Sequence, residues 1–363
     1  MPVSLMLSVS SMTMPNLAQV KDYDSEDMLH LLSAFSEQCR HAREIADTFR
    51  SSRRDERMPS NIVIAGMGGS AIGGDLVKAV LNDQSPIPIF VHRNYILPAF
   101  VTSQTLFIAA SYSGNTEETL QSVETAYARG AEIIAVTSGG KLKAFVNEYH
   151  LPCLLIPSGQ PPRASLGYLS IPILLSLTRM GFAPNLSLTR DLEEAIGLLA
   201  QMAEDFHPDV SDNLPKQLAQ QLHGKLPVLY APQELEAVAM RWKGQISENS
   251  KSLAYYNVFP EMNHNEIEGW KHIPALTKQF CVLQLRDPIA PPQTNRRMDI
   301  TTDLIRQHTA GVTQVYSQGQ SFLARLFSFI AIGDWTSFYL AILYEQDPTP
   351  VARIEELKRR LKT

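Results

Sequence analysis

Two polar clusters in the second half of the chain carry residues that could perform acid–base chemistry. The first, ENSK at 248–251, ends an amphipathic helical pattern, and the second, EMNHNE at 261–266, follows a short aromatic segment. Proton transfer needs a carboxylate base and a group that titrates near neutrality, each held by hydrogen-bonding neighbours. Glu248 and His264 have these chemistries. Either residue alone is more often a solvated charge, a cap or a packing residue, so the assignment depends on the rest of the chain.

Another set of residues has the composition of an anion-binding turn. The stretch 111–119, SYSGNTEET, places short hydroxyls and a glycine between an apolar strand and a helix. Backbone N–H groups at a helix start and short hydroxyl donors together form a nest for a phosphate monoester. A simple polar N-cap would explain one hydroxyl but not three. The stretch 66–74, GMGGSAIGG, also joins a strand to a helix, and its glycines let the backbone approach a ligand.

The stretch 66–74 leaves a second interpretation open. It also satisfies G-x-G-x-x-A, the dinucleotide fingerprint, but the next strand ends in HRN at 92–94, where a ribose-binding Asp or Glu should stand. Arg93 could instead contact the 2′-phosphate of NADP, so an NADP-dependent reductase is an alternative.

A different cation, Arg163, follows two prolines that would fix its turn. A surface arginine is the usual case, whereas one held rigidly near a phosphate nest can stabilise a developing oxyanion.

Short apolar segments indicate the elements that position these residues. Continuous apolar strands are buried on both faces, as in parallel sheets, and ligands bind beyond the carboxyl ends of such strands. The fold class is therefore α/β, with two tandem doubly wound parallel-sheet units, a helix at 25–54 and a helical connector. The expected strands are 61–67, 87–93, 105–111, 132–138 and 152–158 in the first unit, and 228–231, 252–259, 280–287 and 313–318 in the second.

The chain divides into four parts on this interpretation. We expect a disordered N-terminal extension at 1–20, a first domain at 21–183, a helical connector at 184–224 and a second domain at 225–363. The N-terminus is not read as a signal peptide, because it has no basic residue before Lys21. The apolar segment 321–344 contains Arg325 and Asp334, which favours a buried helix over a membrane span.

Composition excludes several classes of function. A length of 363 residues suits two domains, and a net charge of −5 with interspersed signs argues against a nucleic-acid or membrane surface. The three cysteines, Cys39, Cys153 and Cys281, lack metal-like spacing and are interpreted as reduced thiols of a cytosolic protein. The cluster HNE at 264–266 is too tight and isolated to hold zinc, so no metal is expected.

Taken together, these motifs resemble a known family. SYSGNTEET and GMGGSAIGG resemble the sugar isomerase (SIS) domain, a flavodoxin-like unit that binds sugar phosphates. With PPRAS at 161–165, ENSK, EMNHNE and the terminal DPTPVARIEELKRRLK, the chain is similar to bifunctional phosphoglucose/phosphomannose isomerases over roughly residues 61–362. The resemblance implies a cytoplasmic homodimer that interconverts glucose 6-phosphate or mannose 6-phosphate with fructose 6-phosphate. It implies no metal and no cofactor.

The resemblance also implies a role for each site residue. Glu248 would move a proton between C2 and C1 through a cis-enediolate, and Arg163 would stabilise that anion. His264 would assist ring opening in the site of the partner subunit, and Lys358 would contact the ring oxygen. A small hydroxyl residue near that lysine, for which Thr349 is the candidate, would admit both epimers. The phosphate would be held by Gly69, Ser70, Ser111, Ser113 and Thr116.

A non-catalytic sugar-phosphate regulator is a further alternative, because it could use the same first unit. Such regulators usually carry a DNA-binding helix-turn-helix. The acidic, single-helix N-terminus expected here offers none. We therefore expect an isomerase, with the regulator and the NADP-dependent reductase as competing hypotheses.

Overall fold

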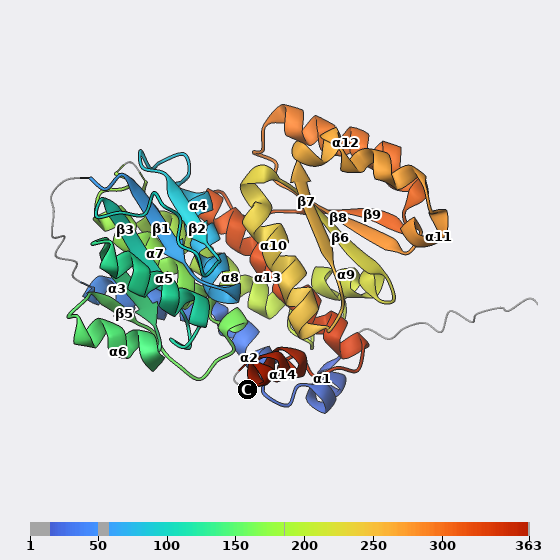
Figure 1. The fold of residues 1–363 in the computed structure, drawn as a ribbon. Coiled ribbons are helices and arrows are strands. Elements are labelled where there is room, and N and C mark those ends of the chain that lie inside the picture. The colour runs from blue at the N-terminus through green and yellow to red at the C-terminus, as the bar shows by residue number, and fades with distance from the viewer. Residues whose placement is uncertain (1–14, 50–57, 185, 362–363) are drawn as a thin grey trace, which may run out of the picture.

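The computed structural model describes residues 15–49, 58–184 and 186–361. It contains two β-sheets, each built of parallel strands (Figure 1). The strands are β1 (Asn61–Ala65), β2 (Ile89–His92), β3 (Thr105–Ala110), β4 (Glu132–Thr137), β5 (Cys153–Leu155), β6 (Leu226–Pro232), β7 (Tyr255–Phe259), β8 (Phe280–Arg286) and β9 (Gly311–Tyr316). The first sheet has the order β2-β1-β3-β4-β5 and the second has the order β7-β6-β8-β9. Every pairing is parallel, which confirms the predicted two α/β units.

The strand order gives each sheet one switch point, which is where ligands usually bind in open parallel sheets. Strands β1 and β3 are buried at every residue, because helices cover both faces of the first sheet. They are neighbours in the sheet, and the chain leaves them toward opposite faces, so their carboxyl ends flank the switch point. Strands β6 and β8 have the equivalent place in the second sheet.

Helices pack on both sheets and connect the two units. Those of the first unit are α4 (Gly68–Leu81), α5 (Glu117–Ala128), α6 (Gly140–Glu148), the 3-10 turn η1 (Pro162–Ala164) and α7 (Leu166–Arg179). The connector contains α8 (Leu188–Asp205) and α9 (Leu214–Leu222). The second unit and the C-terminal region contain η2 (Gln233–Leu235), α10 (Glu236–Asn249), η3 (Glu261–His264), η4 (Glu266–Lys271), α11 (Pro274–Thr277), α12 (Pro292–Ile305), η5 (Arg306–His308), α13 (Phe322–Leu343) and α14 (Ala352–Arg360).

The N-terminal region differs from the single helix predicted at 25–54. It forms α1 (Leu17–Tyr23), α2 (Met28–Ser33) and α3 (Phe35–Thr48). The expectation of disorder over 1–20 is wrong for residues 17–20, because Asn16 forms a capping box with Gln19 and Val20 is buried. Residues 1–14 and 50–57 lie outside the described part of the chain. The domain boundaries at 183 and 224 stay predictions.

Helix α13 passes between the two units and packs against α8, α9 and α10 (Figure 1). An 18-residue window of α13 has a mean hydropathy of 1.6, enough for a membrane span, but 94% of that window is buried inside the protein. The prediction of a buried helix at 321–344 is therefore confirmed. Helix α10 crosses it at Gly333, where an added side-chain carbon would lie 2.2 Å from Nε1 of Trp242. This close crossing fixes the direction of α10, whose last turn carries Glu248.

Candidate active site

The structure brings Ser70, Ser111 and Thr116 together at the carboxyl ends of β1 and β3. The backbone N–H of Tyr112 donates to Oγ of Ser70 at 3.2 Å, and Oγ of Ser111 donates to Oγ1 of Thr116 at 2.9 Å. Neither α4 nor α5 has a side-chain cap at its N-terminus among the described residues. Their first N–H groups are therefore available to an anion, and this cluster of hydroxyls and helix N-termini is here named the nest.

The nest loop is shaped by a glycine and held by the turn after β4. Gly114 has a φ of 67°, and a side-chain carbon there would lie 1.8 Å from the carbonyl oxygen of Gly139. The N–H of Leu142 donates to the carbonyl of Gly114 at 2.9 Å. These contacts leave Ser113 exposed at the tip of the loop, with its Oγ accepting from the N–H of Asn115 at 3.3 Å. The polar turn 137–140 thus supports the nest loop.

A close backbone approach links the nest to the turn that carries Arg163. A side-chain carbon at Gly69 would lie 2.7 Å from the carbonyl oxygen of Pro162, so a larger residue there would displace η1. The hydroxyl of Tyr112 accepts from the N–H of Gln160 at 3.0 Å and ties the same turn to the nest loop. The contact of Gly69 seen here is steric, and its predicted contact with phosphate stays a prediction.

Arg163 is buried, with 5% of its surface exposed, and most of its donors are used inside the protein. Its Nε donates to Oδ1 of Asn249 at 2.7 Å, and its Nη2 donates to the carbonyls of Pro348 and Thr349, each at 2.7 Å. Burial lowers the pKa of the guanidinium, while the charge of Glu248 opposes that shift. Nη1 donates to Oε2 of Glu248 at 3.5 Å, its one hydrogen-bond acceptor among the described residues. This bond is long, so Nη1 is the part of the guanidinium that has donor capacity left for an oxyanion.

Glu248 lies in the last turn of α10 with its side chain 32% exposed. The two predicted residues from different units, Arg163 and Glu248, are thus neighbours. Asn249, which follows the base in sequence, accepts from Arg163 and donates through Nδ2 to Oγ of Ser337 at 2.9 Å. A second contact fixes the turn, because Nη2 of Arg241 donates to the carbonyl of Arg163 at 2.9 Å.

Sequence reasoning missed the buried pair that supports this arrangement. Arg241 and Asp334 form an ion pair between α10 and α13 in which Nε of Arg241 donates to Oδ1 of Asp334 at 3.1 Å. Buried charges are seldom present without a partner. Asp334 inside the apolar segment 321–344 therefore indicated that a buried cation pairs with it. No feature of the sequence identified Arg241 as that cation.

Three predicted residues are not engaged with Glu248 by side-chain contacts within one chain. His264 ends η3 and Lys358 lies on α14, and each side chain is exposed without a hydrogen bond or ion pair to a described residue. Thr349 is 6% exposed and contacts Arg163 through its carbonyl. Its Oγ1 is buried without a partner among the described residues. The catalytic, phosphate-binding and selectivity roles stay predictions for all the site residues.

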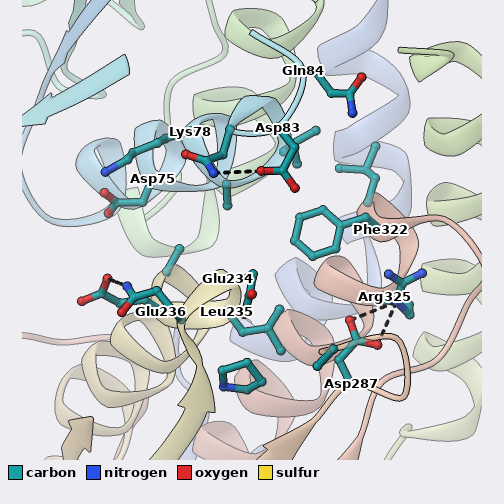
Figure 2. Close-up of a pocket in the computed structure, with 18 of the residues that line it drawn as sticks. Asp75, Lys78, Asp83, Gln84, Glu234, Leu235, Glu236, Asp287, Phe322 and Arg325 are labelled. Atoms are coloured by element: carbon teal, nitrogen blue, oxygen red, sulfur yellow. Dashed lines mark hydrogen bonds and ion pairs between the residues drawn. The ribbon is translucent and has the colours of Figure 1, made fainter. Parts of the chain in front are cut away.

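A separate cleft of about 940 Å³ is lined by α4 and by the segments that follow β6 and β8 (Figure 2). None of its lining residues belongs to the nest or to the surroundings of Glu248. Its acidic side chains outnumber its basic ones, so a phosphate dianion would be repelled there. Arg93, which left the NADP interpretation open, lines this cleft and forms an ion pair with Asp75. The charged lining residues are Asp75, Lys78, Asp83, Arg93, Asp191, Glu234, Glu236, Asp287 and Arg325.

Comparisons with known proteins give the family of the chain. The SIS domain model matches residues 57–144, and the model of the bacterial phospho-glucose isomerase C-terminal SIS domain matches residues 211–361. Among solved structures, a hypothetical protein from Thermus thermophilus is similar with a TM-score of 0.71 at 16% identity, covering 95% of this chain and 92% of that chain. This last likeness supports the fold alone.

Relatives with higher identity carry a functional name. A bifunctional phosphoglucose/phosphomannose isomerase from Caldicellulosiruptor bescii is 46% identical over 328 residues, which cover 90% of this chain and 96% of the relative. A protein of the same name from Aquifex aeolicus is 37% identical over 308 residues, which cover 83% of this chain and 90% of the relative. On this evidence the chain belongs to the family of bifunctional phosphoglucose/phosphomannose isomerases.

Proposed function

We propose that this chain interconverts glucose 6-phosphate and mannose 6-phosphate with fructose 6-phosphate, with Glu248 as the base. One observation carries the proposal. The two charged groups that the reaction needs, a carboxylate from the second unit and a guanidinium from the first, lie 3.5 Å apart beside the nest turn. Gly69 joins the nest to η1 by direct backbone contact, and η1 carries that guanidinium.

The reaction follows from these two groups. The carboxylate of Glu248 takes the proton from C2 of the ring-opened aldose, and the electron pair forms a C1–C2 double bond with negative charge on O1. Nη1 of Arg163 stabilises this enediolate, because a fixed donor acts on developing charge without reorganisation. Glu248 then returns the proton to C1, while O2 loses a proton and O1 gains one. The product is the 2-ketose.

The nest holds the phosphate of the substrate. Ser70, Ser111, Ser113 and Thr116 supply hydroxyl donors, and the uncapped first turns of α4 and α5 supply N–H groups. The phosphate is bound equally in the ground state and the transition state, and holding it orients the reacting carbons toward the base. Loss of a hydroxyl should therefore raise KM before it lowers kcat.

His264 and Lys358 serve ring opening, and a second copy of the chain completes the site. Support comes from the exposure of both side chains and from three exposed apolar residues at spacings of three and four. These are Ile354 and Leu357 on α14 and Leu361 at its C-cap. We propose that α14 and η3 face a partner subunit in a homodimer. Thr349, whose hydroxyl has no described partner, admits both epimers near C2.

The proposed reaction needs no metal, and we place the enzyme in the cytoplasm. Within residues 15–49, 58–184 and 186–361, no three His, Cys, Asp or Glu side chains are grouped as metal ligands. Carbon-acid chemistry with a fixed guanidinium needs no Lewis acid, because Arg163 supplies the positive charge.

The test is a coupled assay of fructose 6-phosphate formation from both aldoses. Glu248→Gln should lower turnover by about 100- to 10,000-fold, because removal of a general base costs that factor. Glu234→Gln makes the same chemical change on an exposed residue of the separate cleft and should leave turnover unchanged. Turnover of folded Glu248→Gln near that of the parent would refute the assignment of the base. Binding of fructose 6-phosphate without exchange of its C1 proton into deuterated water would identify a regulator instead.

A further inference from the structure

We propose that Lys251 is a positioning residue that ties the end of α10 to the C-terminal segment 347–351 and thereby keeps Arg163 from forming a two-bond pair with Glu248. The inference rests on the proposed function of Glu248 as the base. The ammonium of Lys251 donates to the carbonyl of Glu248 at 2.6 Å and to the carbonyl of Pro348 at 3.1 Å. It therefore joins two segments that are 97 residues apart in sequence.

Lys251 is an unfavourable residue for this position on stability grounds. It follows the C-cap of α10 with a φ of 55°, where glycine is the usual residue because other side chains are strained. Its ammonium also lies near the buried cation Arg163. Partial burial is the larger cause and the charge of Arg163 the smaller one, and together they lower the pKa of Lys251 to about 8. Strain and charge repulsion kept at one position are typical of a functional site.

The contact with Pro348 matters because two cations share that carbonyl. Nη2 of Arg163 donates to Pro348 and Thr349, and these bonds hold the guanidinium in the orientation that leaves only Nη1 toward Glu248. If the segment moved away, Nη2 would lose both acceptors. Arg163 could then rotate and form a two-bond pair with the carboxylate of Glu248. Such a pair would occupy both the base and the oxyanion donor.

This arrangement predicts a dependence on pH. The charged groups around Lys251 are Arg163 from η1, Glu248 from α10 and Asp347 from the segment after α13. As pH rises through about 8, the ammonium loses its charge and its hold on the two carbonyls weakens. We therefore expect kcat/KM to fall above that pH, since this ratio reports groups of the free enzyme.

The experiment compares Lys251→Gly, Lys251→Arg and His150→Gly with the parent. Lys251→Gly relieves the strained backbone and removes the charge, so kcat at pH 7 should fall by about 10- to 100-fold while KM changes little. Lys251→Arg keeps a charge that does not titrate in this range, so it should retain activity and move the alkaline limb to higher pH. His150→Gly relieves the same strain at φ 53°, outside the candidate site, and should leave activity unchanged.

Hydrogen exchange of the segment 347–361 is a second readout that does not require activity. Lys251→Gly should exchange faster there than the parent, and His150→Gly should not. Parent-like kcat and an unchanged alkaline limb in Lys251→Gly would overturn the inference and leave the proposed function intact. Should the parent lack isomerase activity, the proposed function fails, and unchanged exchange in Lys251→Gly would then overturn the inference separately. Should Lys251→Gly not fold, Lys251→Arg decides: an alkaline limb of its kcat/KM profile at the same pH as that of the parent would overturn the inference.

Discussion

Substitution of Arg163 by lysine separates the structural and catalytic parts of its predicted role. Three bonds of 2.7 Å run from Nε and Nη2 of Arg163 to Asn249, Pro348 and Thr349, all of which are buried. A lysine ammonium can replace about one of them, and the carbonyl of Pro348 keeps its bond from Lys251, so one buried acceptor is left unpaired at about 1–3 kcal/mol. We therefore expect Arg163→Lys to lower the free energy of unfolding by about 1–3 kcal/mol, measured by urea denaturation.

The same substitution removes the Nη1 donor that faces Glu248, and loss of such a donor costs about 100- to 1,000-fold in kcat. The matched control is Arg129→Lys, because Arg129 also donates three hydrogen bonds but is exposed. Its acceptors are the carbonyls of Leu97, Pro98 and Val101. Arg129→Lys should lose less stability and keep the parent kcat. A kcat within about threefold of the parent in folded Arg163→Lys would refute its role at the enediolate.

Three further outcomes are expected. Gly69→Ala places a carbon 2.7 Å from the carbonyl oxygen of Pro162, so it should lower the free energy of unfolding by about 1–3 kcal/mol and lower kcat. Gly197→Ala is the control, because an added carbon there has nothing within 4 Å. It should be neutral or stabilising in the same denaturation and activity assays. Asp334→Asn leaves Arg241 buried without its counter-charge and should cost about 3–5 kcal/mol of unfolding free energy. Dialysis against a chelator should leave isomerase activity intact, and a lasting loss that metal restores would contradict the metal-free proposal.

The sheets could be predicted from the sequence because their buried strands consist of continuous apolar residues. Strands β1 and β3 bury every residue, and such continuous apolar segments are typical of parallel sheets. The N-terminal helices could not be divided in the same way. The apolar pattern continues from α2 into α3, while the break between them depends on the backbone conformation of Ala34, with a φ of −84° and a ψ of 7°. Periodicity reports which face is buried and does not detect a local turn within it.

The candidate site could be predicted only in part, because its support comes from contacts distant in sequence. Arg163 and Glu248 were both candidates, yet their pairing depends on Asn249, which bonds to Ser337 88 residues away. Thr349 was chosen for its hydroxyl, whereas its carbonyl makes the contact with Arg163. A sequence pattern indicates which side chain has suitable chemistry, but backbone acceptors carry no such signal.

The most direct test of the central claim is a crystal structure of Glu248→Gln with fructose 6-phosphate bound. We expect the phosphate to contact Ser113 and Thr116 in the nest, with C1 and C2 within about 3–3.5 Å of the amide at position 248, the range for reacting atoms. Electron density for the sugar phosphate in the separate cleft of Figure 2 would contradict the account. So would a phosphate in the nest whose sugar extends away from position 248.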